Sequence, residues 1–96
     1  MNKIPLPTMA EILASEFMQP YGLSAYKLAN DINVPVSRIQ DILHSRRRIS
    51  IDTALRLSKY FSMSDSFFIN LQSDIELRES KNRQEDALKA IKPISA

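Results

Sequence analysis

The stretch from Ser24 to Phe61 reads SAYKLANDINVPVSRIQDILHSRRRISIDTALRLSKYF. Its apolar residues recur at the three- and four-residue spacing of an α-helix in three successive segments. A short Asn-Val-Pro sequence separates the first two segments, and three consecutive arginines lead into the third. The stretch therefore predicts two short helices joined by a tight turn, followed by an arginine-rich link and a further helix.

The tight turn is predicted at Asn33-Val34-Pro35. Ser24 is a suitable N-cap for the helix that precedes it. Asn33 is the best candidate other than glycine for the left-handed conformation that such a turn requires. Because proline is tolerated at the first helical position, we expect the next helix to begin at Pro35 or Val36 and to run to about Leu43.

Two helices joined in this way form a helix-turn-helix module, which presents its second helix to the major groove of DNA. In that helix Ile39, Ile42 and Leu43 are expected to face the core. The outward face then carries Val36, Ser37, Arg38, Gln40 and Asp41. Arginine can bind guanine, glutamine adenine and aspartate cytosine, and valine can contact the thymine methyl group. We therefore predict that this face contacts base edges, although an ordinary solvated helix face is the alternative.

Within this set Arg38 is the strongest single candidate, and it could also clamp a phosphate. The arginine run Arg46, Arg47 and Arg48 is predicted to contact phosphates, because it directly follows the base-reading helix. Minor-groove contact, or pairing of one arginine with a carboxylate inside the domain, are the alternatives. Ser24 and Lys27 are further candidates for phosphate contact, because a helix N-terminus presents free N–H groups to an anion.

The distribution of charge agrees with this placement. Residues 1–61 carry eight Lys or Arg and five Asp or Glu, whereas residues 62–96 carry five and six. The first two-thirds of the chain are therefore the expected DNA-binding side.

We divide the chain into an N-terminal arm at residues 1–7, a helical domain at residues 8–75 and a polar C-terminal helix or tail at residues 76–96. Thr8 is the expected N-cap of the first helix of the domain. Pro20 and Gly22 are expected to end that helix.

The helix after the arginine run is predicted to begin after Ser50, and it spaces Asp52 and Arg56 for an ion pair. A further helix is predicted from Ser64 onward. Two adjacent phenylalanines, Phe67 and Phe68, are not expected to face one core together, so one of them is a candidate for a dimer contact.

The composition favours an all-α fold, because the chain has a single glycine and is rich in helix-forming residues. It has no cysteine, and His44 is its only imidazole, so we expect no metal site. Its candidate acid pairs, Glu11 with Glu16 and Asp65 with Asp74, have no nearby nucleophile. We predict no catalytic residues, no cofactor and no small-molecule ligand. Without an apolar run that could span a bilayer, no membrane partner is expected and a cytoplasmic location follows by default.

Three motifs form a specific combined pattern within residues 9–77. They are Val34-Pro35-x-x-Arg38-Ile39-x-x-Ile42; Arg47-x-Ile49-Ser50-x-Asp52-Thr53-Ala54-Leu55-Arg56-Leu57 with Phe61; and Phe68-x-Asn70-Leu71-Gln72. In this pattern the chain resembles the HigA-type (virulence-associated protein I-like) antitoxins, a branch of the lambda-repressor-like (XRE) helix-turn-helix superfamily. It departs from them at Asn33, Ser45 and Ser62, where the family usually has glycine, and at Phe68, where the family often has tryptophan.

The resemblance implies a five-helix DNA-binding domain, a homodimer with two-fold symmetry and a palindromic operator in the protein's own promoter. It also implies a cognate toxin, a RelE-like mRNA endonuclease that the antitoxin neutralises by direct binding. We expect the toxin to contact residues 1–7 or the tail beyond Ile75. One alternative is a stand-alone helix-turn-helix transcriptional regulator without a toxin. Another is a protein-interaction module that does not bind DNA.

Overall fold

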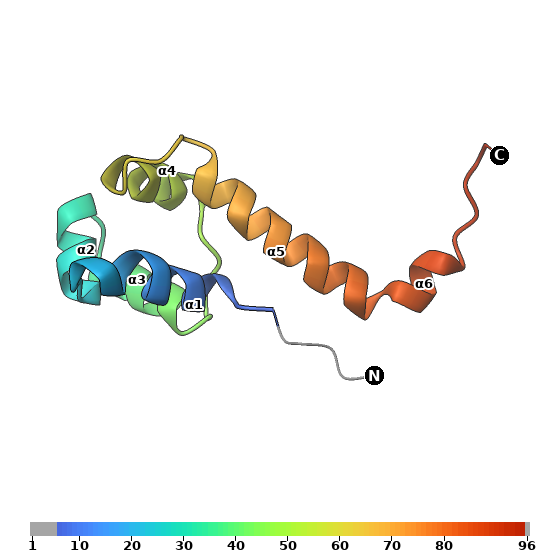
Figure 1. Cartoon of the computed structure of the whole chain (residues 1–96), viewed down its shortest axis with the longest axis horizontal. Helices are drawn as coiled ribbons and strands as arrows, with labels where there is room; N and C mark the ends of the chain where they lie inside the picture. Colours follow the sequence, from blue (N-terminus) through green and yellow to red (C-terminus); the bar gives the residue numbers. More distant parts are fainter. Residues whose placement is uncertain (1–5, 96) are drawn as a thin grey trace.

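The computed structural model describes residues 6–95, and this part of the chain contains helices and no strand (Figure 1). The elements are α1 (Met9–Ile12), a π-helical segment (Leu13–Met18), a 3-10 turn (Gln19–Tyr21), α2 (Ala25–Ile32), α3 (Val36–Leu43), α4 (Ile51–Tyr60), α5 (Phe67–Arg83) and α6 (Glu85–Lys89). The all-α prediction is confirmed. Residues 1–5 of the expected N-terminal arm lie outside the described residues.

The first helical run begins and ends at the predicted residues, but its winding changes along its length. The Thr8 hydroxyl oxygen accepts a hydrogen bond from the Glu11 N–H at 3.1 Å, as an N-cap does. The run then widens into the π-helical segment and tightens into the 3-10 turn that contains Pro20. Because proline has no N–H, a regular α-helix does not continue through this position. Gly22, at φ 63°, ends the run.

Within residues 6–95, four helical segments end in the same backbone motif, each with one left-handed residue. These residues are Gly22, Asn33, Ser45 and Ser62, with φ between 58° and 63°. In each motif the left-handed residue donates its N–H to the carbonyl three residues earlier, and the next residue donates to the carbonyl five residues earlier. This pair of bonds is the Schellman motif, which satisfies carbonyls at the end of a helix. The prediction for Asn33 is confirmed, and two serines adopt the conformation that glycine usually supplies.

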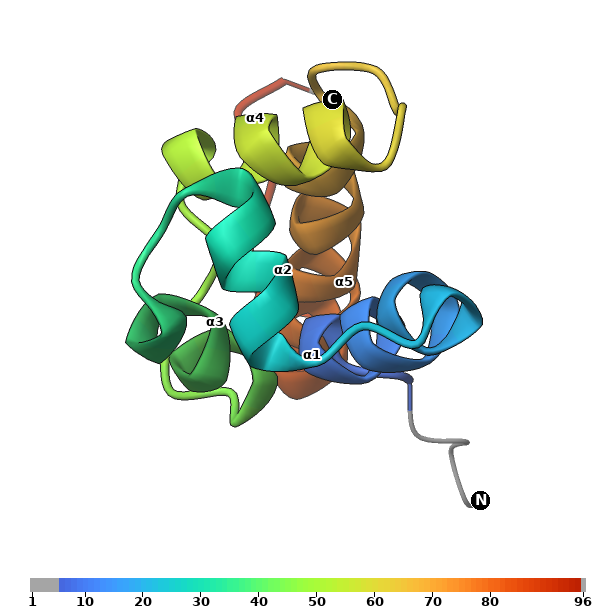
Figure 2. The same ribbon diagram turned by 90° about the vertical axis from the view of Figure 1, so that its left-hand side faces the viewer.

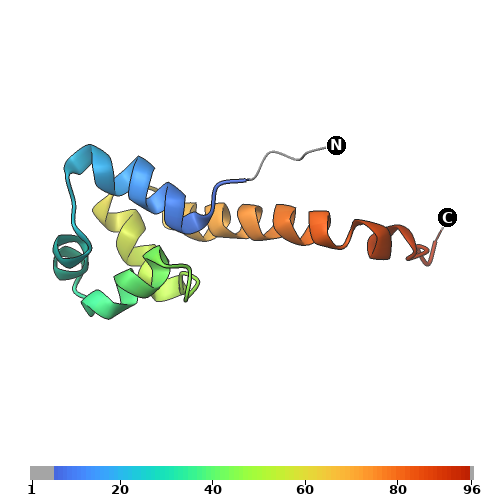
Figure 3. The same ribbon diagram turned by 90° about the horizontal axis from the view of Figure 1, so that it is seen from below.

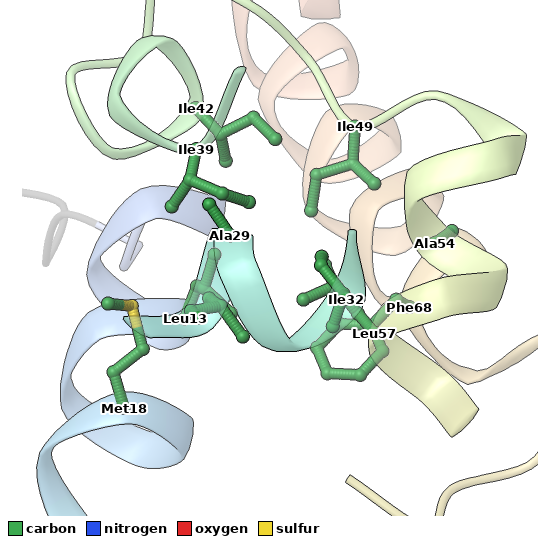
Figure 4. Packing of buried hydrophobic residues seen from close by; sticks show 11 residues of the cluster. Leu13, Met18, Ala29, Ile32, Ile39, Ile42, Ile49, Ala54, Leu57 and Phe68 are labelled. Carbon is green, nitrogen blue, oxygen red and sulfur yellow. The ribbon is translucent and has the colours of Figure 1, made fainter. Parts of the chain in front are cut away.

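The hydrophobic core lies around α2, with side chains contributed by all the surrounding helices. Its buried members are Leu13, Met18, Leu28, Ala29, Ile32, Ile39, Ile42, Ile49, Ala54, Leu57 and Phe68. Figure 4 shows these side chains pointing toward one another from the N-terminal run, α2, α3, the link before α4, α4 and α5. The inward residues predicted for α3 are buried, except Leu43, which is only half-buried. The core therefore fixes α3 against α2 and leaves one face of α3 outside.

The adjacent phenylalanines pack together, contrary to expectation. The Phe17 ring centroid lies 4.9 Å from that of Phe68 and 5.8 Å from that of Phe67. Phe61 joins the same cluster, 5.3 Å from Phe17. Phe68 is buried and Phe67 half-buried, so one aromatic side chain from the first helical run accommodates both residues at the start of α5.

The molecule has a compact helical head from which the second half of α5 projects (Figures 1 and 3). Its principal extents are 52 × 31 × 21 Å. Figure 2, seen along the long axis, places α2 and α3 in front of α5. The boundary expected between residues 75 and 76 falls inside α5, which continues to Arg83, and residues 81–95 are all exposed. Of the helices described, none is both long and apolar enough to cross a membrane.

Candidate nucleic-acid interface

The outward face of α3 is only partly free of intramolecular contacts. Ser37 and Gln40 are exposed, whereas Arg38 and Asp41 are half-buried. Val36 is also half-buried, and it packs against the edge of the core. Ser37 and Gln40 are thus the members of the predicted set whose side chains reach solvent most fully.

Arg38 belongs to a network that connects α2, α3 and α4. Its Nη1 donates to Asp52 Oδ2 at 3.1 Å, and the Arg38 side chain is 29% exposed. Asp52 also accepts from Arg56 Nε, at 3.2 Å to each carboxylate oxygen, so the predicted Asp52–Arg56 pair is confirmed. Arg56 Nη1 in turn donates to the carbonyl of Ile32 at 2.9 Å, at the end of α2. The first turn of α3 is therefore joined to both neighbouring helices through charged groups.

Asp41 and Arg46 form an ion pair across the end of α3. Arg46 Nε and Nη2 lie 3.1 Å and 3.0 Å from Asp41 Oδ1. The backbone N–H of Arg46 also donates to the Asp41 carbonyl at 2.8 Å, within the Schellman motif that Ser45 initiates. An ion pair thus takes the place of the apolar contact that commonly accompanies this motif. One predicted base-contacting residue and one predicted phosphate-contacting residue are brought together here.

The link between α3 and α4 is fastened to α5 by two adjacent contacts. Arg48 Nε and Nη2 donate to Glu76 Oε2 and Oε1 at 2.9 Å and 2.6 Å, a bidentate pair. One turn earlier on α5, the buried Gln72 accepts from the Ile49 N–H at 2.6 Å and donates to the Ile49 carbonyl at 2.8 Å. The hydrogen bond from Arg48 lowers the pKa of the Glu76 carboxyl, and the same bond raises the pKa of Arg48. The link is therefore held at its backbone as well as at a side chain.

Two arginines of the run pair with carboxylates inside the domain, which was the alternative considered for one of them. Arg46 pairs with Asp41 and Arg48 with Glu76, while Arg47 is exposed and has no ion pair among the described residues. The His44 ring Nδ1 lies 2.8 Å from the Gln40 carbonyl at the end of α3. Across residues 6–95, no group of three or more potential metal ligands occurs.

Ser24 and Lys27, the phosphate candidates on α2, make contacts within that helix. The Ser24 hydroxyl oxygen accepts from the Lys27 N–H at 3.0 Å, which confirms the predicted N-cap. Lys27 Nζ lies 2.9 Å from Asp31 Oδ1, and the Tyr60 hydroxyl donates to Asp31 Oδ2 at 2.5 Å. The hydrogen bond from Tyr60, followed by that from Lys27, lowers the pKa of Asp31, and the pKa of Tyr60 is raised by the same bond. These contacts connect α2 to α4 and not to α3 or the arginine link.

Three side chains that support the interface were not assigned to it from the sequence. Asp52 was paired only with Arg56, its neighbour on α4, because its partner Arg38 is 14 residues away in the chain. Gln72 and Glu76 lie more than 20 residues from the link that they hold. The polar Gln72 within the apolar set of α5 was the one available signal, since a buried amide needs a partner.

The fold and this surface define a helix-turn-helix protein, with α3 in the place of the recognition helix. The helix-turn-helix family model matches residues 15–68, and the chain belongs to this family. It is 36% identical to virulence-associated protein I of Dichelobacter nodosus, over 98% of this chain and 86% of that protein. The resemblance to HigA-type antitoxins is confirmed by these matches and by the structures that follow.

Among the solved structures that are similar over nearly the whole chain are two from Pseudomonas aeruginosa. PA4674 of Pseudomonas aeruginosa, solved in complex with its operator DNA, has a TM-score of 0.87 and 32% identity, with 98% of this chain and 100% of that chain covered. The Pseudomonas aeruginosa antitoxin HigA, solved with the higBA promoter, has a TM-score of 0.82 and 32% identity, with 92% and 97% covered. Since the family is one of DNA-binding antitoxins and regulators, the prediction that the chain is not an enzyme is confirmed.

Proposed function

We propose that this protein is a sequence-specific DNA-binding antitoxin of a toxin-antitoxin pair that represses its own promoter. The observation that carries the proposal is the outward face of α3, on which Ser37 and Gln40 are exposed, beside the arginine link, in a chain that is similar over 98% of its length to a protein solved on its operator. As a homodimer it places two copies of α3 in successive major grooves of a palindromic operator, roughly 34 Å apart, and so blocks the promoter. Its place of action is the cytoplasm, where a bacterial promoter is found.

In this proposal the residues divide into two kinds of contact. Val36, Ser37, Arg38, Gln40 and Asp41 carry base recognition. Phosphate contact falls to Ser24, Lys27, Arg46, Arg47 and Arg48, among which Arg47 is the most available because the other two arginines of the run are paired. Phosphate contacts supply affinity that falls with salt, and base contacts supply discrimination between sequences.

DNA binding is tested by fluorescence anisotropy with the duplex from immediately upstream of the protein's own gene and with a scrambled duplex. We expect much tighter binding to the first duplex, weakened as salt is raised from about 50 to 200 mM. Equally weak binding to both duplexes would contradict the proposal and favour a module that contacts only other proteins.

The toxin partner is tested separately by expressing the protein with the product of the adjacent gene. We expect the two to copurify, and the neighbouring product alone to arrest growth through cleavage of mRNA. The neutralised partner is proposed to be a RelE-like endonuclease, bound through residues 1–7 or through the tail beyond Ile75. Operator binding without any such partner would identify the protein as a stand-alone regulator.

A further inference from the structure

The guanidinium group of Arg38 is held by a carboxylate that belongs to a different helix. Asp52, in the first turn of α4, accepts from Arg38 Nη1 at 3.1 Å, and among residues 6–95 it is the one side chain that forms a hydrogen bond or ion pair with that guanidinium. We propose that Asp52 is a positioning residue for DNA recognition, which acts through Arg38 and sets the sequence preference of α3. This inference rests on the proposed function.

The carboxylate of Asp52 is itself fixed from the opposite side. Arg56 Nε lies 3.2 Å from each oxygen of Asp52. Arg56 is anchored in turn, because its Nη1 donates to the carbonyls of Ile32 and Asn33 at 2.9 Å and 3.4 Å. Those carbonyls lie at the C-terminal end of α2, where a cation is favoured. Asp52, whose side chain is 58% exposed, is thus held between Arg38 and Arg56, and Arg56 links it to the end of α2.

An acceptor held in this way reduces the conformational freedom that Arg38 has left to lose when it binds DNA. A free arginine samples many rotamers, and it loses this freedom when it binds a base or a phosphate. Asp52 uses a single nitrogen of the guanidinium, so the other donors keep the planar arrangement that two parallel hydrogen bonds need. Because the side chain already makes one hydrogen bond and is only 29% exposed, part of the ordering cost is met before DNA arrives.

The direction in which DNA affinity changes when Asp52 is removed distinguishes a positioning role from a purely electrostatic effect of its charge. A carboxylate beside a DNA-binding surface repels phosphate, so its removal should strengthen binding to every duplex. The positioning role predicts the opposite for the operator, because removal of Asp52 releases Arg38. Operator affinity should therefore fall while affinity for a scrambled duplex stays constant or rises.

The test is a double-mutant cycle with Asp52→Ala, Arg38→Ala and both together, measured against operator and scrambled duplexes. We expect Asp52→Ala to weaken operator binding about ten-fold in the wild-type background and less than about two-fold when Arg38 is already alanine. The conservative variant Asp52→Asn keeps an oxygen that can accept from Arg38, and should retain most of the discrimination. It also keeps the experiment informative if Asp52→Ala is too unstable to fold.

Two controls complete the design. Asp65→Ala removes the same charge from an exposed position before α5 and should not lower operator affinity. Thermal unfolding of every variant, followed by circular dichroism, separates loss of fold from loss of recognition. The positioning role would be overturned if Asp52→Ala lowered operator affinity equally in the wild-type and Arg38→Ala proteins. It would also be overturned if Asp52→Ala raised the affinity for both duplexes equally. A wild-type protein that does not discriminate the duplexes would instead overturn the proposed function.

Discussion

Ser62 has a backbone conformation that L-amino acids adopt at a cost. Its φ is 59°, and its N–H donates to the Lys59 carbonyl at 3.3 Å, while the next N–H donates to the Ser58 carbonyl at 2.8 Å. The left-handed region costs a residue with a Cβ about 1 to 2 kcal/mol, and glycine adopts it freely. The two hydrogen bonds that end α4 therefore hold a strained residue in place.

Replacing Ser62 by glycine should stabilise the protein, because the relief of strain exceeds the added freedom of the unfolded chain. We expect the free energy of unfolding to rise by about 0.5 to 1 kcal/mol. For a domain of this size that is a rise in Tm of roughly 2 to 6 °C, measurable by circular dichroism. The control is Ser64→Gly, two residues later and not at positive φ, which should lower stability. A drop for both variants would contradict the strain argument.

At the residue scale, local signals in the sequence were reliable and distant pairings were not. The N-caps Ser24 and Ser50 and the left-handed Asn33 follow from the chemistry of a few neighbouring residues. The pairing of Arg38 with Asp52 does not, because several helices have to pack before those side chains meet. The order of charges along a chain does not specify which of several carboxylates an arginine will reach.

At the scale of elements, α5 serves as the support for the arginine link. Gln72 fixes the backbone of the link through Ile49, and Glu76 fixes Arg48 one turn further along the same helix. The two contacts can be changed independently, because the contact of Gln72 with Ile49 involves no charged group and that of Glu76 with Arg48 does. The link can therefore keep its path when Glu76 is changed, while Arg48 becomes available to other anions.

The variant Glu76→Gln should strengthen binding to any duplex, since Arg48 then contacts a phosphate without first giving up its ion pair with Glu76. A full phosphate contact steepens the dependence of log affinity on log salt by about 0.9, and we expect an increase of at most about that size. Anisotropy titrations of a scrambled duplex at several salt concentrations measure it. Glu79→Gln removes the same charge from α5 without breaking the Arg48 pair, so it provides the matched control. Identical gains for the two variants would show a general charge effect and not the release of Arg48.

Periodicity predicted where the helices lie, but it did not predict how the first helical run is wound. The helices α2, α3 and α4 have most of their apolar residues buried where the spacing places them, and Leu43 is half-buried. The π-helical and 3-10 winding of residues 13–21 was not predicted, because apolar spacing does not distinguish these forms from an α-helix over so few turns. Phe67 and Phe68 were misjudged for a related reason: a single aromatic residue, Phe17, reaches both.

At the scale of the whole molecule, the candidate DNA interface and the C-terminal tail are spatially separate. The head contains α1 to α4 and the first half of α5, and the candidate interface lies entirely on it (Figure 3). Beyond Ser80 every described residue is exposed, including the apolar Leu88 and Ile91. Apolar side chains on a projecting segment do not stabilise the head, so the stability and the DNA binding of the protein should be independent of its last residues.

Deleting residues 84–96 tests this independence. The deletion removes two carboxylates, Glu85 and Asp86, and two lysines, Lys89 and Lys92, so the net charge of the side chains is unchanged. We therefore expect the free energy of unfolding in urea to change by less than about 0.5 kcal/mol, as for a surface change without packing. Operator affinity should be unchanged in the anisotropy titration, because neither α3 nor the arginine link contacts the deleted segment. Weaker operator binding with an unchanged free energy of unfolding would show that the tail joins two copies on DNA, and a large loss of stability would show that it packs on the head.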